Sequence, residues 1–175
     1  LDDPAWGGFE SAKVKEQANP PGMVIVEGGE FVMGSMTDNV RYEWHNQPKK
    51  VTVSSFYMDE CEVTNHAYRE YLYWLNRVYG NDYPEVYQRA LPDTLVWRSK
   101  LSYNEPMVDY YFRHPSWADY PVVGVSWVQA SDYCTWRTDR VNEMILVEAG
   151  VLEMIDPDQQ GDNVFTTDAY YAGQY

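Results

Sequence analysis

Alternating and β-branched hydrophobic positions predict strands early in the chain. Residues 23–26 form an apolar β-branched run, Gly28 and Gly29 follow it, and residues 30–34 read as a second strand. Because glycine adopts positive φ at no steric cost, this pattern predicts a β-hairpin that turns at the glycine pair. Alternation over residues 51–58 predicts a third strand, with a slip or bulge near Ser54 and Ser55.

Two later segments change to the period of an amphipathic helix. Thr64 or Asn65 is a good N-cap, and the apolar residues that follow end before Gly80; they are Tyr68, Leu72, Leu75 and Tyr79. Ser126 is expected to cap a second helix that stops at Gly150. Its apolar stripe is predicted to consist of Trp127, Ala130, Cys134, Val141, Ile145 and Ala149.

The remaining segments lack long periodic runs. Residues 81–120 are rich in Pro, Tyr and Trp, which predicts ordered loop with short helices, and residues 120–125 predict a short apolar strand. Residues 1–22 are expected to be an extended N-terminal arm, residues 23–155 the domain, and residues 156–175 a truncated insertion. The fold class expected from this mixture of strands and helices is α+β, with a β-hairpin and two main amphipathic helices.

Composition and charge narrow the possible partners. The 175 residues are 45% hydrophobic and 16% aromatic, which is typical of one globular domain. Their 27 acidic and 13 basic residues give a net charge of −14, which repels a phosphate backbone and disfavours binding to nucleic acid. No apolar stretch approaches the roughly 20 residues of a membrane-spanning helix, so membrane association is expected only through a covalently attached lipid.

Residue types that carry chemistry are present but scattered. His45, His66 and His114 lack metal-ligand spacing, so we expect surface or loop histidines and no metal site. Cys134 lies on the predicted apolar stripe and is expected to be an inert core cysteine. Whether Cys134 pairs with Cys61 stays open, because sequence does not give the distance between them.

Two groups of carboxylates are weaker candidates. Asp59, Glu60 and Glu62 precede the first helix, where the helix dipole favours acidic side chains without any catalytic role. The segment from Asp156 to Gly161 is similar to the start of a calcium loop, with Asp158 as a second possible ligand. Its closing position falls on Thr167 rather than on a glutamate, so a solvated turn is the expectation.

Three ordered segments resemble signatures of the formylglycine-generating-enzyme-like family. They are Met-Val-Ile-Val-Glu-Gly-Gly-Glu-Phe-Val-Met-Gly at 23–34, Phe-Tyr-Met-Asp-Glu-Cys-Glu-Val-Thr-Asn at 56–65, and Tyr-Pro-Val-Val-Gly-Val-Ser-Trp at 120–127 with Ala130, Tyr133, Cys134 and Trp136. The resemblance implies the N-terminal part of a C-type-lectin-like α+β domain. Enzymes of that family use copper and cysteines of the C-terminal half of the domain to oxidise a substrate cysteine, and nothing in this chain resembles those cysteines.

Within that family the chain is similar to the gliding-motility lipoproteins of the GldJ type, and less closely to those of the GldK type. The segments that carry this likeness are 3–9, 42–44, 91–97, 103–106 and 136–143. It implies an outer-membrane lipoprotein on the periplasmic side, with no cofactor and no catalytic, cofactor-binding or metal-binding residues. The implied partners are other proteins of the gliding and type 9 secretion machinery, such as outer-membrane translocon or ring components.

The expected function is therefore a non-catalytic structural or interaction module, with the aromatic residues of 81–120 as contact surface. One alternative is a copper-dependent formylglycine-generating oxidase that acts on cysteine. A second is a calcium- or carbohydrate-binding lectin-like module, which rests on fold analogy and the partial loop at Asp156.

Overall fold

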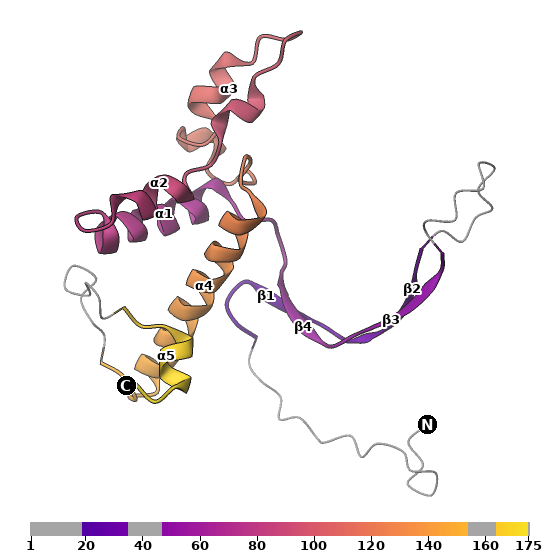
Figure 1. The fold of residues 1–175 in the computed structure, drawn as a ribbon, viewed down its shortest axis with the longest axis vertical. Helices are drawn as coiled ribbons and strands as arrows, with labels where there is room; N and C mark the ends of the chain where they lie inside the picture. The colour runs from indigo at the N-terminus through magenta and orange to yellow at the C-terminus, as the bar shows by residue number, and fades with distance from the viewer. Residues whose placement is uncertain (1–18, 35–46, 154–163, 175) are drawn as a thin grey trace, which may run out of the picture. The chain divides into compact units, whose positions relative to one another are not determined.

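A computed structural model of the chain describes residues 19–34, 47–153 and 164–174. The chain divides into two compact units, Leu1–Glu60 and Cys61–Tyr175. The first contains two small antiparallel sheets, and the second contains helices (Figure 1). This mixture of helices and small sheets agrees with the α+β class that the sequence predicts.

The first unit is a two-stranded antiparallel ribbon (Figure 1). Strand β1 (Met23–Val26) pairs with β4 (Phe56–Asp59), and β2 (Gly29–Met33) pairs with β3 (Lys49–Val53). The register is the same on both sides of the interruption, since Val26 pairs with Phe56 and Gly29 with Val53. Two residues on each strand therefore separate the sheets, and the predicted bulge near Ser54 and Ser55 is an interruption without an extra residue.

The predicted hairpin between β1 and β2 is wrong. These strands follow each other along one side of the ribbon and do not pair. Gly28 serves close approach instead of a turn: a Cβ there would lie 2.6 Å from the backbone nitrogen of Ser55 and 2.7 Å from the carbonyl oxygen of Val53. The Gly28 amide donates to Ser55 Oγ at 2.9 Å, which fastens the ribbon across its interruption.

The first helix of the second unit matches its sequence pattern. Helix α1 (Asn65–Tyr79) begins after Thr64, whose Oγ1 accepts a hydrogen bond from the Ala67 amide at 3.2 Å, and ends at Gly80. Its buried face contains the predicted Tyr68, Leu72 and Leu75. The helix is stable here because its apolar stripe is covered, which matters more than propensity for a helix of this length.

Short helices fill the segment between α1 and the last long helix, as predicted for residues 81–120. They are α2 (Pro84–Ala90), η3 (Thr94–Trp97), α3 (Glu105–Tyr110) and η4 (Pro115–Trp117). Proline occupies the first or second helical position in α2, α3 and η4. Proline is tolerated there because the first turn has no internal acceptor for its missing N–H.

The predicted strand at residues 120–125 is reduced to one isolated bridge, between Thr64 and Pro121. Gly124 has a φ of +82° and lies so close to Asp93 that a Cβ would collide with the Asp93 carbonyl oxygen. The Asp93 amide donates to the Gly124 carbonyl at 2.8 Å. This contact turns the segment away from an extended course, so its apolar residues pack without forming a strand.

Helix α4 (Trp127–Glu148) starts where the sequence predicts, at Ser126. Ser126 and Gln129 form a reciprocal capping box: the Gln129 amide donates to Ser126 Oγ at 3.3 Å, and the Ser126 amide to Gln129 Oε1 at 2.7 Å. The side-chain Nε2 of Gln129 also donates to the Leu91 carbonyl at 2.9 Å. The cap therefore both starts α4 and attaches it to the segment after α2.

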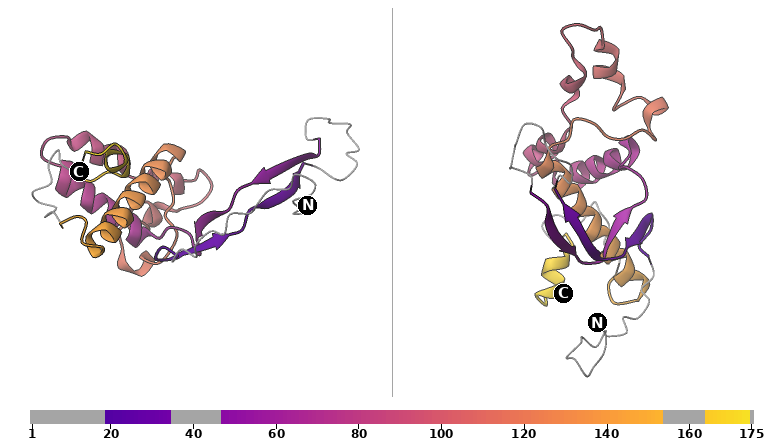
Figure 2. Two further views of the ribbon diagram at one scale, coloured as in Figure 1. Left: turned by 90° about the horizontal axis from the view of Figure 1, so that it is seen from below. Right: turned by 90° about the vertical axis from the view of Figure 1, so that its right-hand side faces the viewer.

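The core of the helical unit lies between α1, α2 and α4, which are neighbours in the views of Figure 2. Tyr68 and Tyr133 stack with ring centroids 5.6 Å apart, and Tyr71 meets the Tyr133 ring edge-on at the same distance. Trp136 lies 5.1 Å from the Tyr71 ring. Such pairs contribute about 0.5–1.5 kcal/mol each beyond area burial, so aromatic packing fixes how α1 and α4 meet.

The last described segment packs on α4. Helix α5 (Thr167–Tyr171) is capped by Thr166, and Phe165 just before it is only 2% exposed. The Thr167 amide donates to Asp139 Oδ1 at 2.9 Å, and Asn142 Nδ2 donates to Thr167 Oγ1 at 3.0 Å. Residues 164–174 are thereby held by one face of α4.

Candidate functional site

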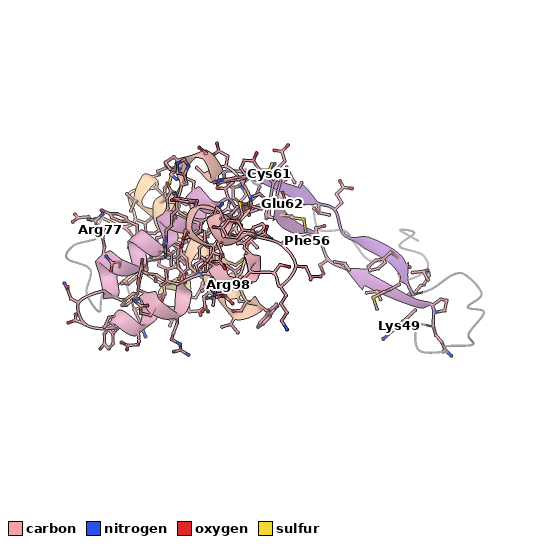
Figure 3. The ribbon with its side chains drawn as sticks, turned by 90° about the horizontal axis from the view of Figure 1, so that it is seen from above. Lys49, Phe56, Cys61, Glu62, Arg77 and Arg98 are labelled. Atoms are coloured by element: carbon pink, nitrogen blue, oxygen red, sulfur yellow. The ribbon has the colours of Figure 1, made fainter. Side chains whose placement is uncertain are left out.

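Both cysteines are exposed and free. Cys61 lies with Glu62 in the connection from β4 to α1 (Figure 3), and Cys134 lies within α4. The prediction of a buried core cysteine at Cys134 is wrong. Tyr133 is the buried residue of this turn, and successive helical positions are rotated by about 100°, so its neighbour Cys134 faces solvent.

The predicted apolar stripe of α4 is wrong for the same reason. Trp127 is 82% exposed and Ile145 53% exposed, while Tyr133 is buried and Trp136 packs against the core. The buried face is the one whose rings, Tyr133 and Trp136, pack against Tyr71 of α1.

The histidines of the described residues do not converge. His66 is exposed, with Nε2 3.5 Å from a carboxylate oxygen of Glu70, and His114 Nδ1 accepts from the Ser116 amide at 3.2 Å to cap η4. His45 lies outside the described residues. Within residues 19–34, 47–153 and 164–174, no group of three or more His, Cys, Asp or Glu side chains is placed to hold a metal ion.

The carboxylates singled out by sequence lie around the end of β4 and in a segment outside the described residues. Asp59 is the last residue of β4, and Glu60 and Glu62 are exposed after it. The calcium-like segment from Asp156 to Gly161 lies outside the described residues, whereas its closing position, Thr167, is the first residue of α5.

Asn65, the first residue of α1, is a buried polar residue whose hydrogen bonds the sequence does not predict. Asn65 is 0% exposed, and its Nδ2 donates to the Trp117 carbonyl at 2.9 Å and to the Tyr111 carbonyl at 3.3 Å. Its backbone amide donates to the Tyr120 carbonyl at 2.8 Å. One asparagine therefore fixes the segment 111–120 on α1, although sequence marks it only as a possible cap.

Arg140 is a second polar contact that sequence does not predict. Its guanidinium lies 4.7 Å from the centre of the Trp74 ring, its Nη2 donates to the Phe165 carbonyl at 2.6 Å, and its Nη1 lies 3.1 Å from Glu143 Oε2. Burial raises the pKa of Glu143, Arg140 opposes this shift, and Asp139 adds to it. Arg140 joins α1, α4 and the segment before α5.

Burial raises the pKa of two tyrosines of the core. Burial, reinforced by Asp132 and Tyr79, raises the pKa of Tyr71 to about 12, and burial raises the pKa of Tyr68 well above its usual range. Tyr68 donates its hydroxyl to the Ala90 carbonyl at 2.9 Å. Since a phenol of raised pKa stays protonated at neutral pH, these groups hold the fold together and are poor general bases.

The aromatic residues of 81–120 divide into two sets. Trp97, Tyr111 and Trp117 pack together, with ring centroids 4.7 Å apart for Trp97 and Tyr111 and 5.4 Å apart for Tyr111 and Trp117. Tyr103 is 82% exposed and Tyr110 57% exposed. Tyr83 at 48% and Tyr120 at 52% are exposed as well, so the rings available to a partner are fewer than the sequence suggests.

Large apolar side chains in solvent are the main surface feature of the helical unit. Among its described residues, four are more than four fifths exposed: Leu101 at 98% and Tyr103, Trp127 and Tyr171 at 82% each. Within the described residues, no helix is long and apolar enough to cross a membrane. The exposure of the four side chains makes them candidates for contact with another molecule.

Comparison with known proteins places these motifs in a family. The model of the sulfatase-modifying factor enzyme 1-like domain matches residues 8–145. The chain is 31% identical over 134 residues to the serine/threonine-protein kinase Pkn1 of Chlamydia trachomatis, which covers 75% of this chain and 19% of that protein. No solved structure matches the chain.

Two mammalian relatives carry different descriptions. The formylglycine-generating enzyme of Mus musculus is 26% identical over 164 residues, covering 74% of this chain and 42% of that enzyme. The inactive C-alpha-formylglycine-generating enzyme 2 of Mus musculus is 27% identical over 139 residues, covering 71% of this chain and 45% of that protein. The chain thus spans less than half the length of each of these relatives, and it belongs to the family of sulfatase-modifying factor enzyme 1-like domains.

Proposed function

We propose that this chain is a non-catalytic interaction component of the gliding-motility and type 9 secretion machinery, held by a lipid at the periplasmic face of the outer membrane. The observation that carries the interaction role is the exposure of Trp127 and Tyr171, each 82% exposed, on the helical unit. Tyrosine and tryptophan supply much of the binding energy at protein interfaces. Hydration of an exposed apolar ring is unfavourable in free energy, and a partner that covers the ring removes this cost.

The assignment to this machinery rests on sequence likeness. The segments 91–97, 103–106 and 136–143 resemble the GldJ-type lipoproteins, and all three lie within the family match. Partners would be outer-membrane translocon or ring proteins. The net charge of −14 supports protein partners over nucleic acid, because an acidic chain gains nothing from release of the counterions of a phosphate backbone.

Affinity isolation of the native complex from outer membranes tests the proposal. We expect components of the secretion machinery to co-purify with the wild-type chain and to be reduced for Trp127→Ser, which removes a side chain that is 82% exposed at the start of α4. Thr138→Ala, at an exposed position of the same helix, is the matched control and should retain them. Recovery without any component of that machinery would contradict the proposal.

An oxidase is the second candidate, because relatives described as formylglycine-generating enzymes are among the matches. The non-catalytic alternative has support of the same kind, since the mouse and cattle relatives of the second type are described as inactive. Cys61 lies in the connection before α1 and Cys134 lies in α4, and each is exposed and free. An oxidase would have to use one of these thiols or others outside this sequence.

A further inference from the structure

The loop of residues 99–104, between η3 and α3, is closed at its base by an ion pair. Arg98 donates from Nε to Glu105 Oε1 at 2.8 Å and from Nη2 to Glu105 Oε2 at 2.9 Å. Paired, charge-assisted bonds of this kind fix both distance and orientation. Arg98, labelled in Figure 3, and Glu105 flank the loop on either side, so its ends are held together while its tip projects.

The tip exposes two large apolar side chains, and some of its polar groups form hydrogen bonds with one another. Leu101 is 98% exposed and Tyr103 82% exposed. The Leu101 amide donates to Ser99 Oγ at 3.4 Å, and Asn104 Nδ2 donates to Ser102 Oγ at 3.1 Å. A loop that supplies some of its own hydrogen bonds loses less when it enters a medium poor in water.

The charge and size of the tip favour a lipid surface over a protein pocket. Residues 99–104 contain Lys100 and no acidic residue, in a chain with 27 acidic and 13 basic residues. Two side chains offer far less area than the roughly 1,200 Å² that a specific protein interface needs. Leucine, tyrosine and lysine side by side suit a bilayer interface, where an apolar body is buried and a polar end stays wet.

We propose that the 99–104 loop inserts Leu101 and Tyr103 into the interface of a lipid bilayer, as a second contact of a chain that is held at the membrane by another means. The inference rests on the proposed function only for that first attachment. Two inserted side chains bind weakly alone, and a membrane contact of this size becomes populated when a first attachment raises the local concentration.

An artificial tether tests the insertion separately from the natural anchor. The full chain, with Cys61→Ser and Cys134→Ser, receives an environment-sensitive nitrobenzoxadiazole label at Lys100→Cys and a hexahistidine tag. It is then bound to phosphatidylcholine vesicles that contain a nickel-chelating lipid. We expect the emission to shift to the blue and to be quenched by lipids with a nitroxide on the acyl chain. A matched label at Thr138→Cys on α4 should show neither the blue shift nor the quenching.

Substitution at the tip completes the test. Leu101→Ser and Tyr103→Ser should together abolish the shift and the quenching, while the circular dichroism spectrum stays unchanged because both side chains are exposed. If the label at position 100 shows no blue shift and no quenching on vesicles, the proposed insertion is wrong. If the same label is shielded in the isolated native complex, the tip contacts a protein instead. Absence of secretion components from that complex would overturn the proposed function and leave the vesicle result standing.

Discussion

Replacing Asn65 with alanine should destabilise the helical unit strongly. The side chain is 0% exposed, and its Nδ2 donates to the carbonyl oxygens of Tyr111 and Trp117. A buried acceptor left without its donor costs about 1–3 kcal/mol. The Tyr111 carbonyl loses this donor, whereas the Trp117 carbonyl keeps the Tyr120 amide at 3.2 Å, so we expect a decrease of ~1–3 kcal/mol in the free energy of unfolding.

Asn65→Asp sharpens this prediction. Aspartate has nearly the same shape, but at neutral pH it sets carboxylate oxygens against the same two carbonyl oxygens, so it should destabilise more than alanine does. Lowering the pH until the new carboxyl is protonated should recover part of the loss, since a protonated carboxyl regains one donor.

Urea unfolding, followed by far-ultraviolet circular dichroism and by tryptophan fluorescence, measures both variants. The matched control is Asn76→Ala on the same helix at an exposed position, where the change should stay within about 0.5 kcal/mol. The reasoning is refuted if Asn65→Ala unfolds at the same urea concentration as Asn76→Ala.

Three further changes test other contacts. Gly28→Ala should disrupt the ribbon, because its Cβ would lie 2.6 Å from a backbone nitrogen of the opposite strand, whereas Gly29→Ala meets nothing within 4 Å and should be silent in amide hydrogen exchange of the strands. Arg140→Met should release the segment at Phe165, seen as faster limited proteolysis at residues 164–174; equal rates would contradict the role of Arg140. Glu143 has a pKa raised from 4.5 by burial, so its contribution to stability is present at pH below 4.5 and is lost as pH rises through the folded pKa. Glu143→Gln should therefore gain stability relative to wild type as pH rises from acid to neutral, and a constant difference in the free energy of unfolding would contradict this.

The helices were predictable because local signals agreed with tertiary packing. Thr64 and Ser126 cap α1 and α4 as their sequence contexts indicate, and Tyr68, Leu72 and Leu75 form a stripe that the core covers. In these helices the capping residue, the hydrophobic period and the burial all indicate the same structure. A sequence specifies a helix or strand when such signals agree.

Strand pairing was not predictable, because it is not local. Val26 and Gly29 both pair with residues more than twenty positions away, and the glycine pair between them has the composition of a turn. Only the opposing backbone at Ser55 explains why Gly28 is needed. Register depends on cross-strand partners, so a pattern within one strand does not identify its neighbour.

The face of α4 and the contacts of Arg140 were missed for another reason. Several apolar stripes fit that long helix, and the rings of α1 select the one that contains Tyr133. Phe165 lies in a polar part of the sequence, and its carbonyl accepts a hydrogen bond from Arg140, twenty-five positions earlier in the chain. Each of these depends on a contact partner far along the chain.

Oxidation of a cysteine peptide is the most direct test of the non-catalytic claim. The full chain, supplied with copper and oxygen, is incubated with a sulfatase-type peptide, and mass spectrometry follows conversion of the peptide cysteine to formylglycine. We predict the same rate as with copper alone and no change for Cys61→Ser or Cys134→Ser. Turnover by the chain that is lost in either serine variant would contradict the account.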